Sequence, residues 1–154
     1  MNPGSDVTLQ LACTVRPAQP KDCDAMAYLA VQLGYECTGR EVQQRLSEMQ
    51  DPTHFAVFVA ELDDGQLAGW IGAYLFQSVE TGSCAEINGM VVEQSIRSRG
   101  IGRALLHAAE EWGRSFGCNE ISVRSNVKRD RAHQFYAKNG YQHVKTQKEF
   151  RKSL

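Results

Sequence analysis

Two glycines and three arginines within Arg97–Arg103 form the part of the sequence whose residue types are best suited to bind an anion. This segment lies between an apolar run (87–92) typical of a strand and an apolar-periodic run (104–116) typical of a helix. At such a junction the first N–H groups of the helix lack intrahelical partners, and the helix dipole adds a positive potential. Glycine leaves room for an anion, and arginine suits polyphosphate. The segment therefore predicts a phosphate-binding loop; on spacing alone, a turn with glycines for geometry and arginines for solubility remains the alternative.

The composition narrows the class of protein. The chain has 154 residues and a formal net charge of −1, which favours one domain and argues against broad binding to nucleic acid or anionic membranes. No apolar run reaches the length of a membrane span, and the first residues lack the pattern of a secretory signal. The five cysteines and four histidines are scattered without disulfide or metal-ligand spacing. We therefore expect a cytoplasmic protein with reduced cysteines and no metal.

The hydrophobic periodicity predicts the elements that position the loop. Alternation indicates a first strand ending at Pro17, and helical spacing indicates two helices, the second starting at a capping box formed by Thr38 and Glu41. A meander of three strands then leads into the loop and a third helix. The expected strands span 9–17, 54–61, 67–76, 85–92 and 120–125, with a weak final hairpin over 141–147 and 150–154; the expected helices span 26–33, 38–49, 101–116 and 130–139.

Some details within these elements are open to a direct check. Gly69 and Gly72 are possible bulge sites in the second strand of the meander. Asp130 is the expected N-cap of the fourth helix. The predicted core stripe of the third helix comprises Ile101, Ala104, Leu105, Ala108 and Trp112.

Three segments together resemble the GNAT family of N-acetyltransferases, over about residues 8–154. Arg97, Gly100 and Gly102 match the family's acyl-CoA loop, and Ile87-Asn88-Gly89-Met90-Val91-Val92 is similar to its fourth strand. The third segment comprises Ser125-Asn126, Ala132-His133-Gln134-Phe135-Tyr136 and Asn139-Gly140-Tyr141. One position departs from the pattern: members often carry a proline three residues before the loop arginine, where this chain has Gln94.

The resemblance implies a fold of the α+β class with layers in the order α/β/α. Its central sheet would be mixed and mostly antiparallel, with about seven strands, a splayed pair formed by the fourth and fifth strands, and four helices. It also implies a single N-acetyltransferase domain over 8–154, preceded by a disordered or extended terminus over 1–7.

Acetyl-CoA is the cosubstrate that the resemblance implies, with its pantetheine arm lying between the splayed strands as a pseudo-strand. Backbone groups of Met90 and Val92 would bond the arm's amides, and the pyrophosphate would lie on the N–H groups of Arg99–Arg103. Asn126 and Tyr136 would reach the far side of the arm, near the sulfur. The full set of expected cofactor-binding residues is Met90, Val91, Val92, Arg97, Ser98, Arg99, Gly100, Ile101, Gly102, Arg103, Asn126, His133 and Tyr136.

Two residues are expected to move protons. Glu86 matches the position of the catalytic glutamate in histone-type members and is the expected base for the amine; a surface glutamate or a partner for substrate charge is the alternative. Tyr136 is the expected acid at the departing thiolate, and a packed core tyrosine is the alternative. Because the amine attacks directly, no covalent acyl-enzyme is expected.

The implied reaction is transfer of an acetyl group from acetyl-CoA to a primary amine of a small molecule, of polyamine or aminoglycoside type. A protein or peptide amine as the acceptor, and a non-catalytic acyl-CoA-binding module, are alternatives. Exposed final strands add the expectation of a homodimer, and no nucleic-acid or membrane partner is expected. The acidic residues around the expected acceptor pocket, which suit a cationic acceptor, are Glu36, Glu41, Glu80 and Glu86.

Overall fold

The computed structural model describes residues 10–154 of the chain. The expectation of a disordered or extended terminus over 1–7 lies outside the described residues. Internal contacts divide the chain into two compact units, one ending at Arg124 and one spanning Ser125–Leu154. The single domain over 8–154 stays a prediction.

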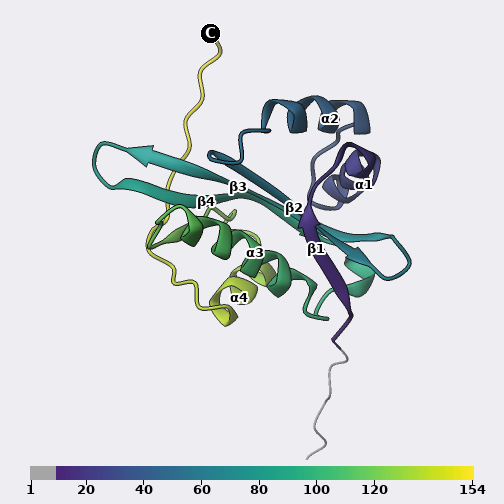
Figure 1. Cartoon of the computed structure of the whole chain (residues 1–154). Helices are drawn as coiled ribbons and strands as arrows, with labels where there is room; N and C mark the ends of the chain where they lie inside the picture. Colours follow the sequence, from purple (N-terminus) through teal and green to yellow (C-terminus); the bar gives the residue numbers. More distant parts are fainter. Residues whose placement is uncertain (1–9) are drawn as a thin grey trace, which may run out of the picture. The chain divides into compact units, whose positions relative to one another are not determined.

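A five-stranded sheet dominates the first unit, with its strands in the order β1-β2-β3-β4-β5 (Figure 1). Neighbouring strands are antiparallel from β1 to β4, and β5 is parallel to β4. The predicted mixed, mostly antiparallel sheet is therefore confirmed. The strands are β1 (Cys13–Pro17), β2 (Phe55–Leu62), β3 (Leu67–Ser78), β4 (Gly82–Val92) and β5 (Ile121–Val123).

The number of strands is five in the described residues, rather than about seven, because the predicted final hairpin is wrong. Residues 141–154 contain no helix or strand. This stretch is largely polar and charged, and its apolar residues Val144 and Phe150 are 84% and 87% exposed. A few apolar residues do not make a strand when they bury no surface.

Three helices cover the two faces of the sheet. Helices α1 (Cys23–Gln32) and α2 (Gly39–Glu48) lie on one side and α3 (Ile101–Ser115) on the other (Figure 1). The Trp70 indole N–H on β3 donates to the Met26 carbonyl on α1 at 3.2 Å, and Ala85 on β4 lies directly beneath Gly113 of α3. Since side chains alternate along a strand, residues that share the parity of Trp70 on β3 face α1.

The helix boundaries follow their capping residues. The predicted capping box of α2 is confirmed, with reciprocal bonds between Thr38 and Glu41. Trp112 was expected in the core of α3, but it is only half-buried: its indole N–H donates to the Pro52 carbonyl at 3.1 Å. A tryptophan keeps its polar edge near an acceptor, so the buried face of α3 is shifted to Ile101, Leu105, Leu106, Ala109 and Gly113.

Two bulges interrupt the ladders of β3, each next to one of the predicted glycines. The β2–β3 register shifts beside Gly69, and the β3–β4 register shifts beside Gly72. In the second bulge Asn88 of β4 is the extra residue, because Ile87 pairs with Ala73 and Gly89 pairs with Gly72. The Asn88 side chain lies over Gly72, where a Cβ would come within 2.5 Å of its Oδ1.

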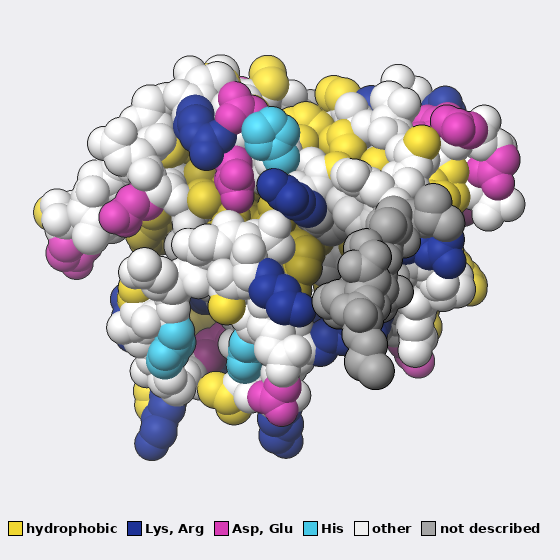
Figure 2. Space-filling view, turned by 90° about the horizontal axis from the view of Figure 1, so that it is seen from below, with side chains coloured by type: hydrophobic (Ala, Val, Ile, Leu, Met, Phe, Trp, Pro, Cys, Tyr) yellow, Lys and Arg dark blue, Asp and Glu magenta, His cyan; other side chains and the backbone are white. Residues whose placement is uncertain are grey.

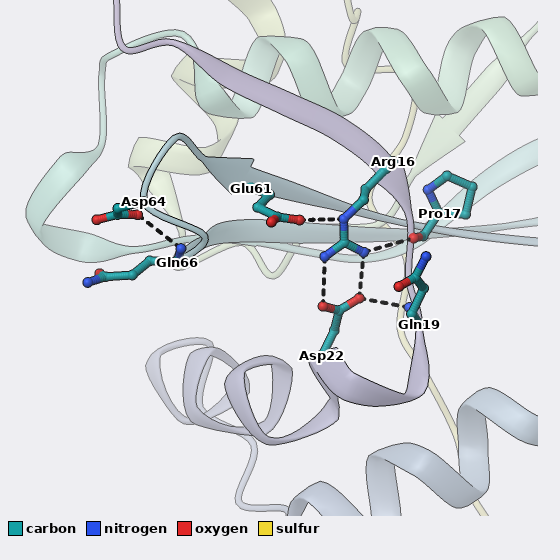
Figure 3. A network of polar contacts seen from close by, with 7 residues as sticks. All are labelled: Arg16, Pro17, Gln19, Asp22, Glu61, Asp64 and Gln66. Atoms are coloured by element: carbon teal, nitrogen blue, oxygen red, sulfur yellow. Dashed lines mark hydrogen bonds and ion pairs between the residues drawn. The ribbon is translucent and has the colours of Figure 1, made fainter.

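An ion-pair network ties β1 and β2 to the start of α1 (Figure 3). Arg16 on β1 donates through both terminal nitrogens to Asp22, at 2.8 and 2.9 Å, and through Nε to Glu61 on β2. Asp22 is buried in the short 3-10 helix η1 (Pro20–Asp22), and its carboxylate also accepts the Gln19 N–H. Burial by itself would raise the pKa of Asp22, but the bonds from Arg16 and Gln19 lower it below its ordinary value.

The second unit contains helix α4 (Asp130–Lys138). Arg129 occupies its N-cap, so the predicted cap at Asp130 is wrong; Asp130 lies in the first turn, where its charge still suits the helix dipole. Asn139 ends the helix as predicted. The centroid of the Tyr136 ring lies 5.4 Å from the centroid of the Phe135 ring and 5.5 Å from that of the Tyr141 ring.

The exposed side of α3 carries charges of both signs, from Arg103 and His107 to Glu111 and Arg114. Figure 2 shows dark-blue, cyan and magenta side chains on the face seen from below.

Among residues 10–154, no helix is long and apolar enough to cross a membrane, and no group of three potential metal ligands is found.

Candidate active site

The far half of β4 has an open edge. The parallel ladder with β5 joins Ala85 to Ile121, Glu86 to Ser122 and Ile87 to Val123, and it ends there. From Gly89 to Val92, β4 pairs with β3 only, within the described part of the chain. The ladder ends next to the Asn88 bulge, and a bulge bends and twists the strand that carries it. This arrangement is the expected splay between the fourth and fifth strands.

The backbone groups on this open edge are those of Met90 and Val92. The Glu93 N–H donates to the Ala68 carbonyl at 2.7 Å. Hydrogen-bonded and non-bonded pairs alternate in an antiparallel ladder, so Val91 bonds with β3 while Met90 and Val92 direct their N–H and C=O groups away from β3. The Val92 carbonyl accepts a bond of 3.1 Å from Arg97 Nε.

The loop between β4 and α3 ends in an exposed set of backbone donors. It passes through the short 3-10 helix η2 (Gln94–Ile96), then Ser98 at φ 65° and Gly100 at φ 87°. Gly100 is the N-cap of α3, and the first helical bond runs from Ala104 N–H to the Gly100 carbonyl. The N–H groups of residues 101–103 therefore have no acceptor within the described chain. Arg99 and Arg103 are exposed beside them, and Arg97 is half-buried.

Glu86 is a nearly buried carboxylate whose oxygens are already engaged. Its side chain is 11% exposed and forms an ion pair with Arg124, from Nε to Oε1 at 3.1 Å, whereas the Arg124 side chain is 71% exposed. The Tyr74 hydroxyl donates to Oε1 at 3.0 Å, and the Ser122 hydroxyl lies 3.4 Å from Oε2. Burial, followed by the bond to Glu86, raises the pKa of Tyr74, which keeps that hydroxyl a donor.

The remaining predicted residues belong to the second unit. The Asn126 side-chain oxygen accepts the Lys128 N–H at 2.9 Å. The backbone carbonyl oxygen of Asn126 lies 2.9 Å from His133 Nε2. Burial raises the pKa of the Tyr136 hydroxyl, although nearby Arg129 partly offsets the shift. The structure thus brings together the edge and loop residues within the first unit, and Asn126 and His133 within the second.

Sequence reasoning missed three residues that contact the predicted site. Tyr74 faces Glu86 directly across the β3–β4 hairpin, and counting back from the turn could have found it. Arg124 is found only once β5 is paired with β4. Gln32, at the end of α1, bonds to Glu93 and to the Gln94 N–H, and no sequence pattern joins these distant residues.

The mixed sheet with an open edge beside the β4–α3 loop is the arrangement that the resemblance to acetyltransferases implies. The model of the Acetyltransferase (GNAT) family matches residues 23–141, and the chain belongs to that family. It is accordingly an enzyme, an N-acetyltransferase.

Whole-length relatives extend the comparison. The chain is 29% identical over 147 residues to aminoglycoside N(6')-acetyltransferase type 1 of Stenotrophomonas maltophilia, covering 93% of this chain and 95% of that protein. The crystal structure of an aminoglycoside antibiotic 6'-N-acetyltransferase from Acinetobacter baumannii matches with a TM-score of 0.81 at 18% identity, over 93% of this chain and 99% of that one. The structure of aminoglycoside N-acetyltransferase AAC(6')-Iy in complex with CoA gives 0.82 at 20% identity, over 93% and 96%.

Proposed function

We propose that this enzyme transfers the acetyl group of acetyl-CoA to a primary amine of a small cationic molecule of aminoglycoside type. The observation that carries the acceptor class is the whole-length similarity to aminoglycoside N(6')-acetyltransferase type 1 of Stenotrophomonas maltophilia. The open edge of β4, which leads directly to the free N–H groups of α3, supports acetyl-CoA as the donor.

Acetyl-CoA would contact the open edge of β4 with its pantetheine arm and the loop between β4 and α3 with its pyrophosphate. The amides of its pantetheine arm pair with the backbone groups of Met90 and Val92, as an added strand would. The Val92 carbonyl has a second lone pair beside the one that Arg97 uses. The pyrophosphate lies on the N–H groups of residues 101–103, where Arg99 and Arg103 add positive charge. The remaining contacts to acetyl-CoA come from Val91, Ser98, Gly100, Asn126 and His133.

The amine must lose a proton as it attacks the thioester carbonyl. An amine with a pKa near 10.4 is neutral in about one molecule in a few thousand at pH 7, a handicap of about 4–5 kcal/mol. Glu86 accepts this proton, directly or through a water. The C–N bond forms, the C–S bond breaks, and the thiolate leaves with a hydrogen bond or proton from Tyr136. The raised pKa of Tyr136 keeps its hydroxyl protonated at neutral pH.

The acceptor would reach Glu86 in competition with Arg124. The Arg124 guanidinium is paired with the Glu86 carboxylate, and the Arg124 side chain is exposed to solvent. Because the arginine side of this pair is open to solvent, water screens its charge, and an ammonium group can compete with it for the carboxylate. A cationic acceptor thus gains a charge partner at the base that later deprotonates it.

A thiol-release assay with acetyl-CoA tests the proposal across an aminoglycoside with a primary 6'-amine, a polyamine and a lysine-containing peptide. We expect release with the aminoglycoside above the other two amines. Release only with the peptide would replace the acceptor class. Calorimetric binding of acetyl-CoA without release from any amine would support a non-catalytic module instead.

A further inference from the structure

The side chain of Gln32 joins α1 to the start of the loop between β4 and α3. Its Nε2 donates to Glu93 Oε2 at 2.9 Å, and its Oε1 accepts the Gln94 N–H at 2.9 Å. Gln32 is the last residue of α1, and its two partners lie about 60 positions later in the chain. One amide group therefore holds together two segments that no backbone hydrogen bond joins.

The two partners fix the orientation of this amide. The Glu93 carboxylate only accepts hydrogen bonds and the Gln94 N–H only donates one, so a flipped amide would lose both contacts. Methionine would fill the same space and form neither bond. Glutamate would accept from Gln94 but set a second carboxylate against Glu93. Among residues of this size, only glutamine satisfies both groups.

Glu93 also shapes the first turn of the loop. It is the N-cap of η2, its Oε1 accepts the Ser95 N–H at 3.4 Å, and its carbonyl accepts the Ile96 N–H at 3.1 Å. A carboxylate tied to Gln32 has fewer rotamers available and keeps this cap in place. The ordered turn sets the direction in which the chain continues toward Ser98 and Gly100.

Gln94 occupies a position at which the backbone would accept a proline. It is the first residue of η2, and Glu93 before it has φ −48° and ψ 126°. This ψ lies in the range that the residue before a proline adopts, and proline suits the first position of a helix. A proline would fix this turn through its ring but would lack the N–H that Gln32 binds.

We propose that Gln32 is a positioning residue that holds the cofactor loop in its binding-competent form, in place of a proline at position 94. This inference rests on the proposed use of the loop by acetyl-CoA. A loop that is competent for only part of the time binds its ligand more weakly by that fraction, and ordering it on binding reduces affinity. Gln32 also links the loop to the C-terminal end of α1, which leads toward Glu36, one of the acidic residues around the expected acceptor pocket.

Calorimetry with acetyl-CoA on four variants tests the proposal. Gln32→Met is expected to raise Kd about five- to tenfold. Gln43→Met, an exposed glutamine on α2, is the matched control and should stay within about twofold of wild type. Gln94→Pro alone should also stay within about twofold, because the ring replaces the lost bond. In the Gln94→Pro background, Gln32→Met should raise Kd by less than about threefold.

Two results would overturn the inference: an unchanged Kd in Gln32→Met, or an equal loss with and without Gln94→Pro. Steady-state kinetics separate positioning from general damage, since positioning raises KM for acetyl-CoA while kcat, acceptor KM and Tm stay the same. If wild type fails to bind acetyl-CoA, the proposed function fails. Amide exchange over 95–103 then still decides, because faster exchange in Gln32→Met than in Gln43→Met is required without any ligand.

Discussion

At the scale of single residues, Tyr136 offers the sharpest separation between packing and chemistry. Its ring contacts Phe135 and Tyr141, and Tyr136→Phe retains those contacts while removing one hydroxyl. If the hydroxyl stabilises the thiolate, kcat should fall about 10²-fold, or about 3 kcal/mol, with little change in acetyl-CoA affinity. Burial raises the pKa of Tyr136 above its ordinary value. Ionisation of this hydroxyl should therefore cause no loss of activity below about pH 10.

Single-turnover kinetics give the measurement, and Tyr141→Phe serves as the control in the same ring cluster. A Tyr136→Phe enzyme with normal kcat, under conditions in which chemistry limits the rate, would remove Tyr136 from the mechanism. A fall in kcat shared equally by Tyr141→Phe would point to packing of the rings.

Arg124 gives a second prediction at this scale. Arg124→Gln removes the cation that pairs with Glu86, so a cationic acceptor no longer has to displace it. Acceptor KM at low salt should fall about two- to fivefold with kcat unchanged, because solvent screens the exposed Arg124 side of the pair. Arg114→Gln, which removes an exposed arginine paired with Glu111 on α3, is the matched control.

The pair Glu86 and Arg124 also provides an internal test. In a Glu86→Gln background, Arg124→Gln should leave acceptor KM unchanged, because there is no carboxylate left to release. A higher KM in the single Arg124→Gln variant would instead assign Arg124 to acceptor binding or to the orientation of Glu86.

At the scale of elements, the entry to α3 depends on the conformation of one residue. Gly100 has φ 87°, and a Cβ there would also lie 3.1 Å from the Gln10 side chain. Gly117, at φ 78°, has the same left-handed conformation with open space around it. Alanine at either position should lower the free energy of unfolding by about 1 kcal/mol. Only Gly100→Ala should also raise Kd for acetyl-CoA, by about fivefold or more.

Urea denaturation and calorimetry on both variants provide the check, with Gly117→Ala accounting for the cost of the left-handed backbone. Equal acetyl-CoA affinities in the two alanine variants would mean that the loop geometry at Gly100 is not needed for binding.

The elements that the sequence predicted well are those with local signals. The capping box at Thr38 and Glu41 and the alternation that predicts a strand ending at Pro17 act within a few residues, and the structure follows them. The failures lie where a distant partner decides. Trp112 turns its polar edge toward the Pro52 carbonyl, and Val144 and Phe150 in the stretch 141–154 stay exposed instead of packing.

The candidate site likewise contains residues that local spacing predicts and residues that only distant contacts reveal. The glycine–arginine loop was found from local spacing, because a strand, two glycines and a helix are contiguous in sequence. The contacts of Gln32 and Arg124 depend on how segments far apart in sequence come together. A pairwise hydrogen bond has no periodicity, so reading one sequence cannot reveal it.

At the scale of the whole molecule, the Arg16 network makes stability depend on pH. Asp22 has a lowered pKa in the folded state, so its contribution is fully present above the unfolded value of about 3.9 and is lost as pH falls through the lower folded value. Asp22→Asn should reduce the free energy of unfolding at pH 7 by about 2–3 kcal/mol, because Arg16 loses a buried partner.

Urea titrations at pH 7 and pH 3 measure this dependence, and Asp63→Asn, in the exposed β2–β3 turn, is the control. The gap in stability between wild type and Asp22→Asn should narrow at pH 3. A gap that is the same at both pH values would mean that the charge of Asp22 contributes nothing to folding.

The bulge at Asn88 separates what the chain needs in order to fold from what it needs in order to work. A chain shortened by this one residue would keep all the other pairs between β3 and β4, because Ile87 and Gly89 already face consecutive residues of β3. Every remaining side chain would stay on its own face of the sheet. The shortened strand would lose the bend beside the last pair with β5. Such a deletion should give a well-folded protein whose sheet edge is closed to a ligand, a defect that stability measurements alone would overlook.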